Sequence, residues 1–459
     1  MNRRTRLLLL LAVVATFVCP AVAFGLGTPV QPGSATAAGF LPSSGCACHA
    51  ARVTEWSTSM HAKSIVDTVF LTKVGEAQAE AGDSVAIFCK RCHSPIGNMT
   101  GDPNASASQV AKEGVTCMFC HQVTGLIGVP GNVDQLVDAS LIRRAQLTNP
   151  AAPHPAAYSK LHESAEFCGG CHNVNHPTNG VHLESTYAEW KAGPYAAEGT
   201  VCQDCHMSSA PGVIGPSTGT ACQGGAQRDN IFAMSFVGAN VGQGPAEAST
   251  ALLKRAATVE LDIPGIVAEG TSATVTVTVS NTGAGHYLPT GLTEVRQMWL
   301  SVYVEREDGG KTTLGERRFG TVMKDAKGAY PAEMWNAAGV QSDDRIPPRG
   351  SISASYSFTM PSTAERAKVV AALLYKSVPD DLAAKANVEN PTTEMAVSSR
   401  TVFVSAAAKG TASGTAEPIE STGKPGSVLP FVAGAVVLVV IGVIVGLRGR
   451  AHKDKTSLT

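Results

Sequence analysis

The chain has 459 residues, and its 36 lysines and arginines are balanced by 37 aspartates and glutamates, which gives a formal net charge of −1. This balance excludes the strongly basic surface that nucleic-acid binding needs. The length allows about two or three domains, but aromatic residues make up only 5% of the sequence, few for a large conventional core.

The first predicted element is an export signal over residues 1–23. Basic residues at positions 3, 4 and 6 precede an apolar run, and small residues at 21–23 form a cleavage site. The apolar run is too short for a membrane span. Cys19 lies within it without a convincing lipobox, so it is expected to be removed with the signal. A glycine- and proline-rich lead-in then opens a predicted cytochrome domain over residues 24–250.

Cysteine pairs closed by histidine recur between residues 46 and 206. Four have the form Cys-x-x-Cys-His, and the first is shorter by one residue; the residues are Cys46, Cys48, His49, Cys89, Cys92, His93, Cys117, Cys120, His121, Cys168, Cys171, His172, Cys202, Cys205 and His206. This spacing is typical of c-type haem attachment, in which two thiols bond to the porphyrin and the adjacent imidazole binds iron. Zinc sites and disulfides do not require a histidine after each second cysteine. The pattern predicts five haems c, whose porphyrins would supply apolar mass to the core.

The short motif leaves the number of thioether bonds open. One residue separates Cys46 from Cys48, so the haem is expected to be held by Cys48, with Cys46 as a second attachment. In the alternative interpretation Cys46 is unused or pairs with Cys222, the one cysteine of the mature chain outside the motifs.

Six histidines outside the motifs and the C-terminal tail are candidates for the second axial position of the irons: His61, His154, His162, His176, His182 and His286. His61 ends a helical-looking segment after the first motif, and His162 lies shortly before Cys168, so with His154 these are preferred. His176 and His182 flank one turn, and at most one of them is expected to bind iron. For each histidine the alternative is an ordinary surface or capping role.

Residues 56–61, 162–174, 186–191 and 201–207 resemble the multihaem c-type cytochromes related to the cytochrome c-554 group. The resemblance covers about residues 46–207. It implies electron transfer between partners through haems that are mostly ligated by two histidines and stacked in close pairs. Related chains carry a histidine where this chain has Met234, so Met234 is a candidate thioether ligand or, alternatively, a packing residue.

An alternating pattern rich in β-branched residues begins near residue 251 and predicts an all-β, immunoglobulin-like sandwich over 251–405. Strands are expected around 258–263, 273–279, 298–304, 351–358, 369–375 and 399–404, with a hairpin turn at 308–310. The one histidine of this domain, His286, lies in a glycine-rich turn that related multihaem chains also carry. We therefore expect His286 to bind an iron of the cytochrome domain.

The C-terminal segments predict a membrane anchor. Residues 406–427 read as a flexible linker, the uncharged stretch 428–447 as a transmembrane helix, and 448–459 as a basic cytoplasmic tail. A buried soluble helix is the alternative for 428–447. The predicted orientation puts the haems on the periplasmic or extracellular side of the cytoplasmic membrane.

The combined prediction is a mixed fold: a helical and loop-rich multihaem domain, a β-sandwich and a transmembrane helix. The function expected is electron transfer with redox partner proteins, without hydrolytic or acyl-transfer residues. Two alternatives stay open. One is an oxidoreductase whose open haem acts on a small nitrogen or sulfur compound; the other is a subunit of a cytochrome filament, homo-oligomer or respiratory complex.

Overall fold

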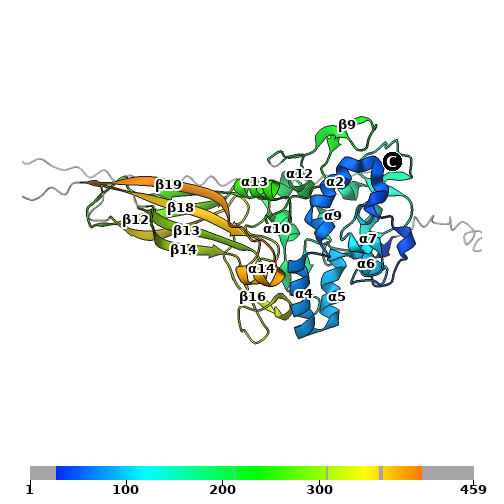
Figure 1. Ribbon diagram of the computed structural model, residues 1–459, viewed down its shortest axis with the longest axis horizontal. Helices are drawn as coiled ribbons and strands as arrows, with labels where there is room; N and C mark the ends of the chain where they lie inside the picture. Colours follow the sequence, from blue (N-terminus) through cyan, green and yellow to red (C-terminus); the bar gives the residue numbers. More distant parts are fainter. Residues whose placement is uncertain (1–26, 211, 307–308, 361–364, 406–459) are drawn as a thin grey trace, which may run out of the picture. The chain divides into compact units, whose positions relative to one another are not determined.

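A computed structural model of the protein describes residues 27–405, apart from 211, 307–308 and 361–364. Helices and short strands make up the chain as far as Ala256, and longer strands follow from Ala257 (Figure 1). The predicted mixed fold is therefore confirmed at this level. The two parts are called the helical part and the β-part below.

The helical part consists of short helices joined by loops and two- or three-stranded pieces of sheet. Its helices are η1 (Ala37–Gly39), η2 (Ser43–His49), α2 (Ala50–Thr58), α3 (Met60–Lys63), α4 (Thr68–Ala81), α5 (Asp83–His93), α6 (Pro95–Met99), α7 (Gln109–Lys112), α8 (Cys117–Gln122), η3 (Lys160–Glu163), α9 (Ala165–Gly169), α10 (Thr186–Ala192), α11 (Pro194–Ala197), α12 (Cys202–His206) and α13 (Ala246–Ala256). Its strands are β1 (Thr28–Pro29), β2 (Val123–Leu126), β3 (Gln135–Val137), β4 (Arg143–Ala145), β5 (Ala156–Tyr158), β6 (Val174–Asn175), β7 (His182–Glu184), β8 (Ser217–Thr220) and β9 (Gln227–Ile231).

Side-chain caps set where several of these helices begin. The Asp67 carboxylate accepts the Val69 N–H at 3.0 Å before α4, and the Thr116 hydroxyl accepts the Phe119 N–H at 3.1 Å before α8. Such caps satisfy N–H groups that the first turn of a helix leaves free. Helix α8 therefore starts at Cys117, and it carries a complete cysteine–histidine motif.

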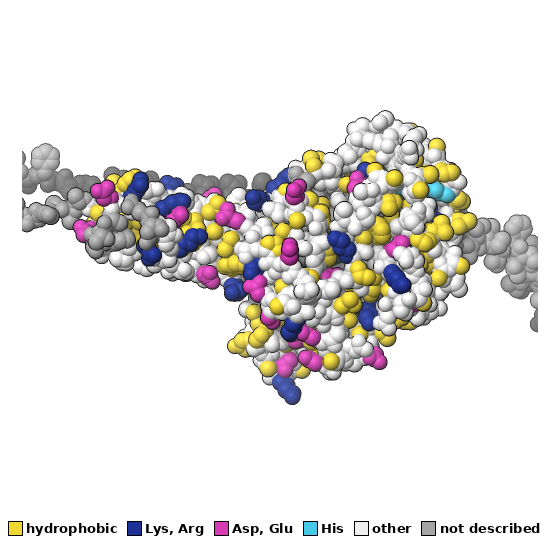
Figure 2. All heavy atoms as spheres, viewed as in Figure 1, with side chains coloured by type: hydrophobic (Ala, Val, Ile, Leu, Met, Phe, Trp, Pro, Cys, Tyr) yellow, Lys and Arg dark blue, Asp and Glu magenta, His cyan; other side chains and the backbone are white. Residues whose placement is uncertain are grey.

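The interior of the helical part is small. Its largest hydrophobic cluster includes Ile96, Met99 and Phe119, and the motif cysteines Cys92, Cys120 and Cys171 pack against it. Apolar side chains also reach the visible surface of this part (Figure 2). Porphyrins bonded to these cysteines would extend the cluster, which agrees with the sparse aromatic content of the sequence.

The β-part contains two main sheets. Its elements are β10 (Ala257–Asp262), β11 (Ile266–Ala268), β12 (Ser272–Asn281), β13 (Gln297–Glu305), β14 (Lys311–Phe319), β15 (Thr321–Lys324), η4 (Met334–Asn336), β16 (Gly339–Asp343), β17 (Ser351–Thr359), β18 (Arg366–Lys376), α14 (Asp380–Ala386) and β19 (Thr393–Ser405). One sheet has the order β10-β12-β17 and the other β11-β19-β18-β13-β14. The six predicted strands coincide with β10, β12, β13, β17, β18 and β19, and the predicted hairpin joins β13 to β14.

One hydrophobic core lies between these sheets. Val275, Val277 and Val279 of β12 have no exposed surface, and they belong to the same cluster as Leu300 of β13 and Leu373 of β18. Alternate residues of a strand point to opposite faces, so the valines of β12 face this core while the threonines between them face outward. The immunoglobulin-like assignment of this pair of sheets remains a prediction.

Helix α4 of the helical part packs against α14 and η4 of the β-part. Lys73 pairs with Glu333 at 2.7 Å, Lys385 pairs with Glu76 at 2.9 Å, and the Trp335 indole donates to Glu80 at 2.8 Å. These contacts hold the two parts together. They lie far in sequence from α13, the helix that leads from the helical part into the β-part.

Four predicted segments lie outside the described residues: the signal peptide over 1–23, the linker over 406–427, the transmembrane helix over 428–447 and the tail over 448–459. Within the part of the chain that the structure does describe, no helix has both the length and the hydrophobicity to span a bilayer.

Candidate haem sites

Each motif lies on a short helix or turn, and the sites are named below by their motif histidine. His93 ends α5, while the His121 and His206 motifs lie in α8 and α12. Residues three apart in a helix lie on the same face, so both thiols of a regular motif point to one side. The His49 motif lies in η2, where Cys46 departs from helical geometry with φ −92° and ψ 34°.

Eight histidines form four pairs with closely similar separations. The ring centroids are 6.4 Å apart for His49 and His154, 6.3 Å for His61 and His172, 6.1 Å for His121 and His162, and 6.3 Å for His206 and His286. Each pair joins one motif histidine to one histidine from outside the motifs. Two metal–nitrogen bonds of about 2 Å and two half-rings of about 1.1 Å give a centroid separation of about 6 Å. The spacing of all four pairs therefore fits an iron between the rings.

The motif histidines are oriented by hydrogen bonds from Nδ1. The Nδ1–H donates to a backbone carbonyl in four of them: His49 to Ala221 at 2.9 Å, His93 to Ser64 at 2.9 Å, His121 to Arg144 at 2.7 Å and His206 to Val237 at 2.6 Å. Because a carbonyl only accepts, the proton lies on Nδ1 and Nε2 keeps its lone pair for a metal. Partners of this kind are usual for metal-binding histidines.

The fifth motif histidine, His172, has a different partner. Its Nδ1 lies 3.1 Å from Oε1 of Glu184, the last residue of β7, so its acceptor is a carboxylate and not a carbonyl. The Thr186 hydroxyl donates to the same oxygen at 3.1 Å. No sequence signal pointed to Glu184, because the contact depends on the hairpin formed by β6 and β7.

The second histidines also keep one nitrogen available. His154 and His286 donate from Nδ1 to the carbonyls of Pro155 at 3.1 Å and Tyr287 at 2.9 Å, which leaves Nε2. His162 is reversed: its Nε2 donates to the Cys120 carbonyl at 2.8 Å, and its buried Nδ1 has no partner among the described residues. The buried Nδ1 of His61 is likewise without a described partner. Buried polar atoms normally have a hydrogen-bond partner. For the buried Nδ1 of His162, an iron ion would take the place of that partner.

Burial keeps most of these imidazoles in the neutral form that binds metals. It lowers the pKa of His61 to about 3 and the pKa of His93, His162 and His206 to about 4. His172 differs, because desolvation alone would lower its pKa but the Glu184 carboxylate raises the pKa to about 9.

The His93 site has no second histidine at a similar distance within the described part of the chain. The His93 ring stacks on the ring of Phe70, with 3.6 Å between the ring centroids and an interplanar angle of 8°. The remaining predicted ligands lie elsewhere: His176 uses Nε2 to reach the Trp335 carbonyl at 3.1 Å and Nδ1 to contact Thr178, and His182 is exposed at the start of β7. Met234 is half-buried, and its backbone N–H donates to Glu55 at 2.8 Å.

Thiols from different motifs lie close together, and these contacts show which motifs are neighbours in space. In three pairs one thiol raises the pKa of the other: Cys117 raises that of Cys46, Cys171 that of Cys92, and Cys202 that of Cys168. Cys92 and Cys171 also pack against the same hydrophobic cluster, and α9, which includes Cys168, contacts α12, which begins at Cys202. The Cys120 and Cys171 thiols are also close enough to interact electrostatically. The His172 motif is therefore adjacent to the His93, His121 and His206 motifs, while the His49 motif adjoins the His121 motif. Cys46 and Cys222 are both free thiols.

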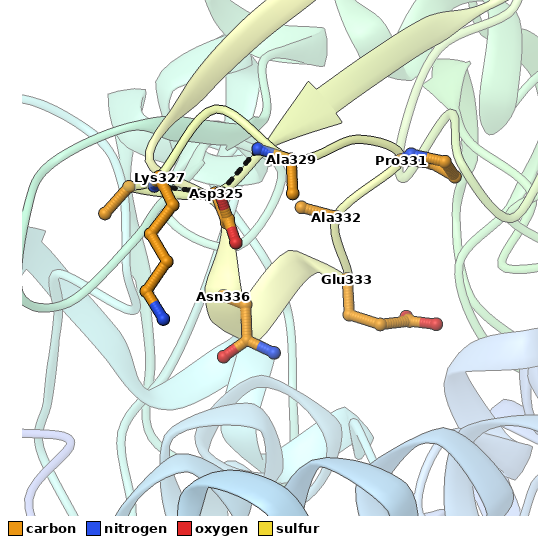
Figure 3. A pocket seen from close by; sticks show the side chains of 8 residues that line it. Asp325, Lys327, Ala329, Pro331, Ala332, Glu333 and Asn336 are labelled. Carbon is orange, nitrogen blue, oxygen red and sulfur yellow. Dashed lines mark hydrogen bonds between the residues drawn. The ribbon is translucent and has the colours of Figure 1, made fainter.

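A hollow of about 410 Å³ in the β-part lies apart from these histidines (Figure 3). Asp325, Lys327, Glu333 and Asn336 line it, and the Asp325 carboxylate accepts the N–H groups of Lys327 and Ala329, both at 2.8 Å. No imidazole or motif cysteine contributes to its wall, so this hollow is not a haem site.

Residues 45–122 match the family model described as cytochrome c554 and c-prime. The chain is related to the multihaem c-type cytochromes of this group. The resemblance predicted from the sequence is thereby confirmed, and the cytochrome binds haem c. A search of curated proteins found no match.

The cytochrome also matches the crystal structure of a penta-heme cytochrome c552 from Thermochromatium tepidum. The TM-score is 0.61 at 21% identity, and the match covers 79% of this chain and 99% of that one. The match thus extends beyond the residues of the family model and shows a shared fold for most of the chain.

Two further matches are confined to smaller parts of the cytochrome. The CARDB domain of a Pyrococcus furiosus protein has 15% identity, covers 32% of this chain and 87% of that one, and gives a TM-score of 0.18. A superoxide reductase from Ignicoccus hospitalis has 9% identity, covers 32% and 80% of the two chains, and gives a TM-score of 0.16. These scores are too low to support an argument.

Proposed function

We propose that the protein is an exported, membrane-anchored pentahaem c-type cytochrome that carries electrons along a chain of mostly bis-histidine haems. One observation carries this proposal: four motif histidines each face a second histidine at 6.1 to 6.4 Å. Six-coordinate iron with two imidazoles has no free position for a substrate, so such sites serve electron transfer.

The proposed ligand pairs are His49 with His154, His121 with His162, His172 with His61 and His206 with His286. Iron at the fifth site is held by His93, with His176, His182 and Met234 as the remaining candidates for its second ligand. Four haems attach through regular motifs. The fifth attaches through Cys48, with Cys46 as the second thiol, and the proximity of Cys46 to Cys117 supports its position at the edge of a haem site.

In this proposal the β-part is an immunoglobulin-like sandwich that supplies one axial ligand to the helical part. The proposed export signal and C-terminal anchor hold the haems outside the cytoplasmic membrane, where c-type maturation takes place. The partners are redox proteins, and a respiratory complex or a homo-oligomer is a larger assembly that the anchor would permit.

Low-temperature EPR of the purified, haem-loaded protein tests the ligand scheme. We expect low-spin signals from the four paired sites, with high-spin signal limited to one haem at most. Two or more high-spin haems in the wild-type protein would contradict the proposed pairs.

A second function is favoured by one specific observation, the lack of a paired histidine at the His93 site within the described residues. An iron held there by His93 alone would leave a position open to a small nitrogen or sulfur compound. The stacked Phe70 ring would then fix the His93 plane without occupying the coordination position. Reduction or oxidation of such a compound by the isolated protein, lost in a variant that blocks only this site, would support the enzyme.

A further inference from the structure

We propose that Glu184 is a positioning residue that makes the haem of the His172 site the one with the lowest midpoint potential of the five. The proposal rests on the proposed function, since it requires haem at this site with His172 as a ligand. It goes beyond that function, because it assigns an electrochemical role to a residue outside the motifs and the ligand pairs.

A carboxylate and a carbonyl differ in charge as hydrogen-bond acceptors. The other four motif histidines donate Nδ1–H to neutral backbone carbonyls, whereas His172 donates to Glu184 at 3.1 Å. An anionic acceptor draws the Nδ1 proton more strongly and so increases the electron density that Nε2 gives to the metal. A more basic axial ligand stabilises ferric over ferrous iron and lowers the potential.

The Glu184 carboxylate is held in place from several sides. Its side chain is 13% exposed, and Thr186 donates to the same oxygen that His172 contacts. The Thr186 hydroxyl lies 2.9 Å from the Thr290 hydroxyl, and Thr290 donates to Glu189 at 2.7 Å. Because each hydroxyl gives its single proton to a carboxylate, Thr186 to Glu184 and Thr290 to Glu189, the two hydroxyls are in contact without a hydrogen bond between them. Thr290 belongs to the β-part, which therefore packs beside the Glu184 site.

The position of the His172 site gives this difference a consequence for electron transfer. Cys171 packs with Cys92 and Cys120 against one hydrophobic cluster, and α9, which includes Cys168, contacts α12, so the His172 motif lies next to the His93, His121 and His206 motifs. In the proposed haem chain, an electron that moves between two of these neighbouring sites can pass through the His172 haem. A low midpoint potential at the His172 haem would make electron transfer onto it unfavourable. Electrons would therefore reside on the haems of the neighbouring sites.

The test compares the full-length, haem-loaded wild type with Glu184→Gln. Glutamine keeps the size and the acceptor oxygen but removes the charge. Spectroelectrochemical titration should give five components in both proteins. We expect the lowest one to move upward in the variant, with the other four unchanged, and one low-spin EPR signal to move with it. Glu184→Asp should restore a potential close to that of the wild type, because it returns the charge.

Glu166→Gln is the matched control. Glu166 lies two residues before Cys168 and accepts hydrogen bonds from Tyr187 and Lys191, both at 3.1 Å, and no imidazole is among its hydrogen-bond partners in the described part of the chain. If removal of this charge raised the same component equally, general electrostatics and not the His172 contact would be responsible. A Glu184→Gln variant whose five potentials equal those of the wild type would likewise overturn the inference.

Failure of the proposed function gives a different result from failure of this inference. If the wild type lacks haem at Cys168 and Cys171, or if His172→Ala leaves all spectra intact, the ligand scheme itself is wrong. If the haem is present and low-spin but its midpoint potential is the same in Glu184→Gln as in the wild type, only the role of Glu184 is wrong. If Glu184→Gln loses haem, Thr186→Val is a second variant. It removes one hydrogen bond to the Glu184 carboxylate, and we expect the lowest of the five midpoint potentials to fall further.

Discussion

The imidazole of His286, in the turn that follows β12, lies 6.3 Å from that of His206 in α12, and the two rings are inclined by only 14°. The first residue belongs to the β-part and the second to the helical part. An iron between them would bond the two parts together, in addition to the side-chain contacts made by α4.

Replacing His286 by alanine should convert one haem to a high-spin or water-bound form and leave the other four low-spin. It should also loosen the β-part, since one of its attachments is removed. EPR counts the converted haem, and limited proteolysis follows the β-part. Glu198→Ala is the control, because it removes a half-exposed contact between the two parts, the pair with Arg349, and leaves every histidine in place. Unchanged low-spin signals in the His286 variant would mean that the β-part supplies no ligand.

Glu189 is expected to hold the His286 turn in position. Its buried carboxylate accepts the Tyr287 N–H at 3.1 Å and the Thr290 hydroxyl at 2.7 Å, and it pairs with Arg345, whose side chain is 11% exposed. Glu189→Ala would leave Arg345 paired with Asp343 at 2.8 Å, but it would remove the acceptor of the Tyr287 and Thr290 hydrogen bonds, and we expect a loss of about 2 kcal/mol in the free energy of unfolding. Denaturant unfolding followed by tryptophan fluorescence measures the loss.

The matched control for Glu189 is another glutamate–arginine pair between the two parts. Glu198 and Arg349 lie 2.6 Å apart, but both side chains are about half exposed. Solvent screens such pairs, so Glu198→Ala should leave the unfolding midpoint almost unchanged. Equal effects of the two substitutions would show that burial of the Glu189 pair is unimportant.

The His93 site should be the one that accepts an external ligand. Carbon monoxide added to the fully reduced protein is expected to bind one haem per chain, because the proposed ligand pairs give the other four irons two imidazoles each. His286→Ala should raise the uptake to two. Absorbance titration gives the stoichiometry, and a wild-type protein that binds none would mean that His176, His182 or Met234 reaches the His93 iron.

The short motif should still carry a haem. The pyridine haemochrome assay is expected to give five haems per chain for the wild type, four for Cys48→Ser and five for Cys46→Ser, since attachment is predicted to depend on Cys48. Mass spectrometry of the denatured protein verifies the covalent bond. A count of five haems in the Cys48 variant would mean that Cys46 provides the main attachment. A count of four in the wild type would mean that the short motif carries no haem.

The predicted anchor gives a fractionation test. The full chain should stay with membranes after a high-salt wash, and a chain ending at Ser427 should be released. Protease added to intact spheroplasts should digest the haem-containing part. Its protection would contradict the predicted orientation.

The sequence was sufficient to locate the motifs and the strands because both are local patterns. Cysteine and histidine spacing marks each haem site by itself, and the alternation of valine and threonine in β12 marks a half-buried strand. It was not sufficient to assign the second ligands. His61 follows the first motif closely in sequence, yet it pairs with His172, while His49 pairs with His154. These pairs depend on packing between distant segments, which no local pattern encodes.

The carbonyl partners of the motif histidines bear on the order in which the chain would complete its sites during the proposed export. A chain that emerges N-terminus first has Ser64 available when His93 appears, so the His93 site can be oriented earliest. His49 is the first motif histidine to emerge, but it must wait for His154 and then for the carbonyl of Ala221. The His206 site waits longer still, for His286. With the proposed ligand pairs, maturation of the first site would depend on nearly the whole helical part, and maturation of the last would depend on the β-part.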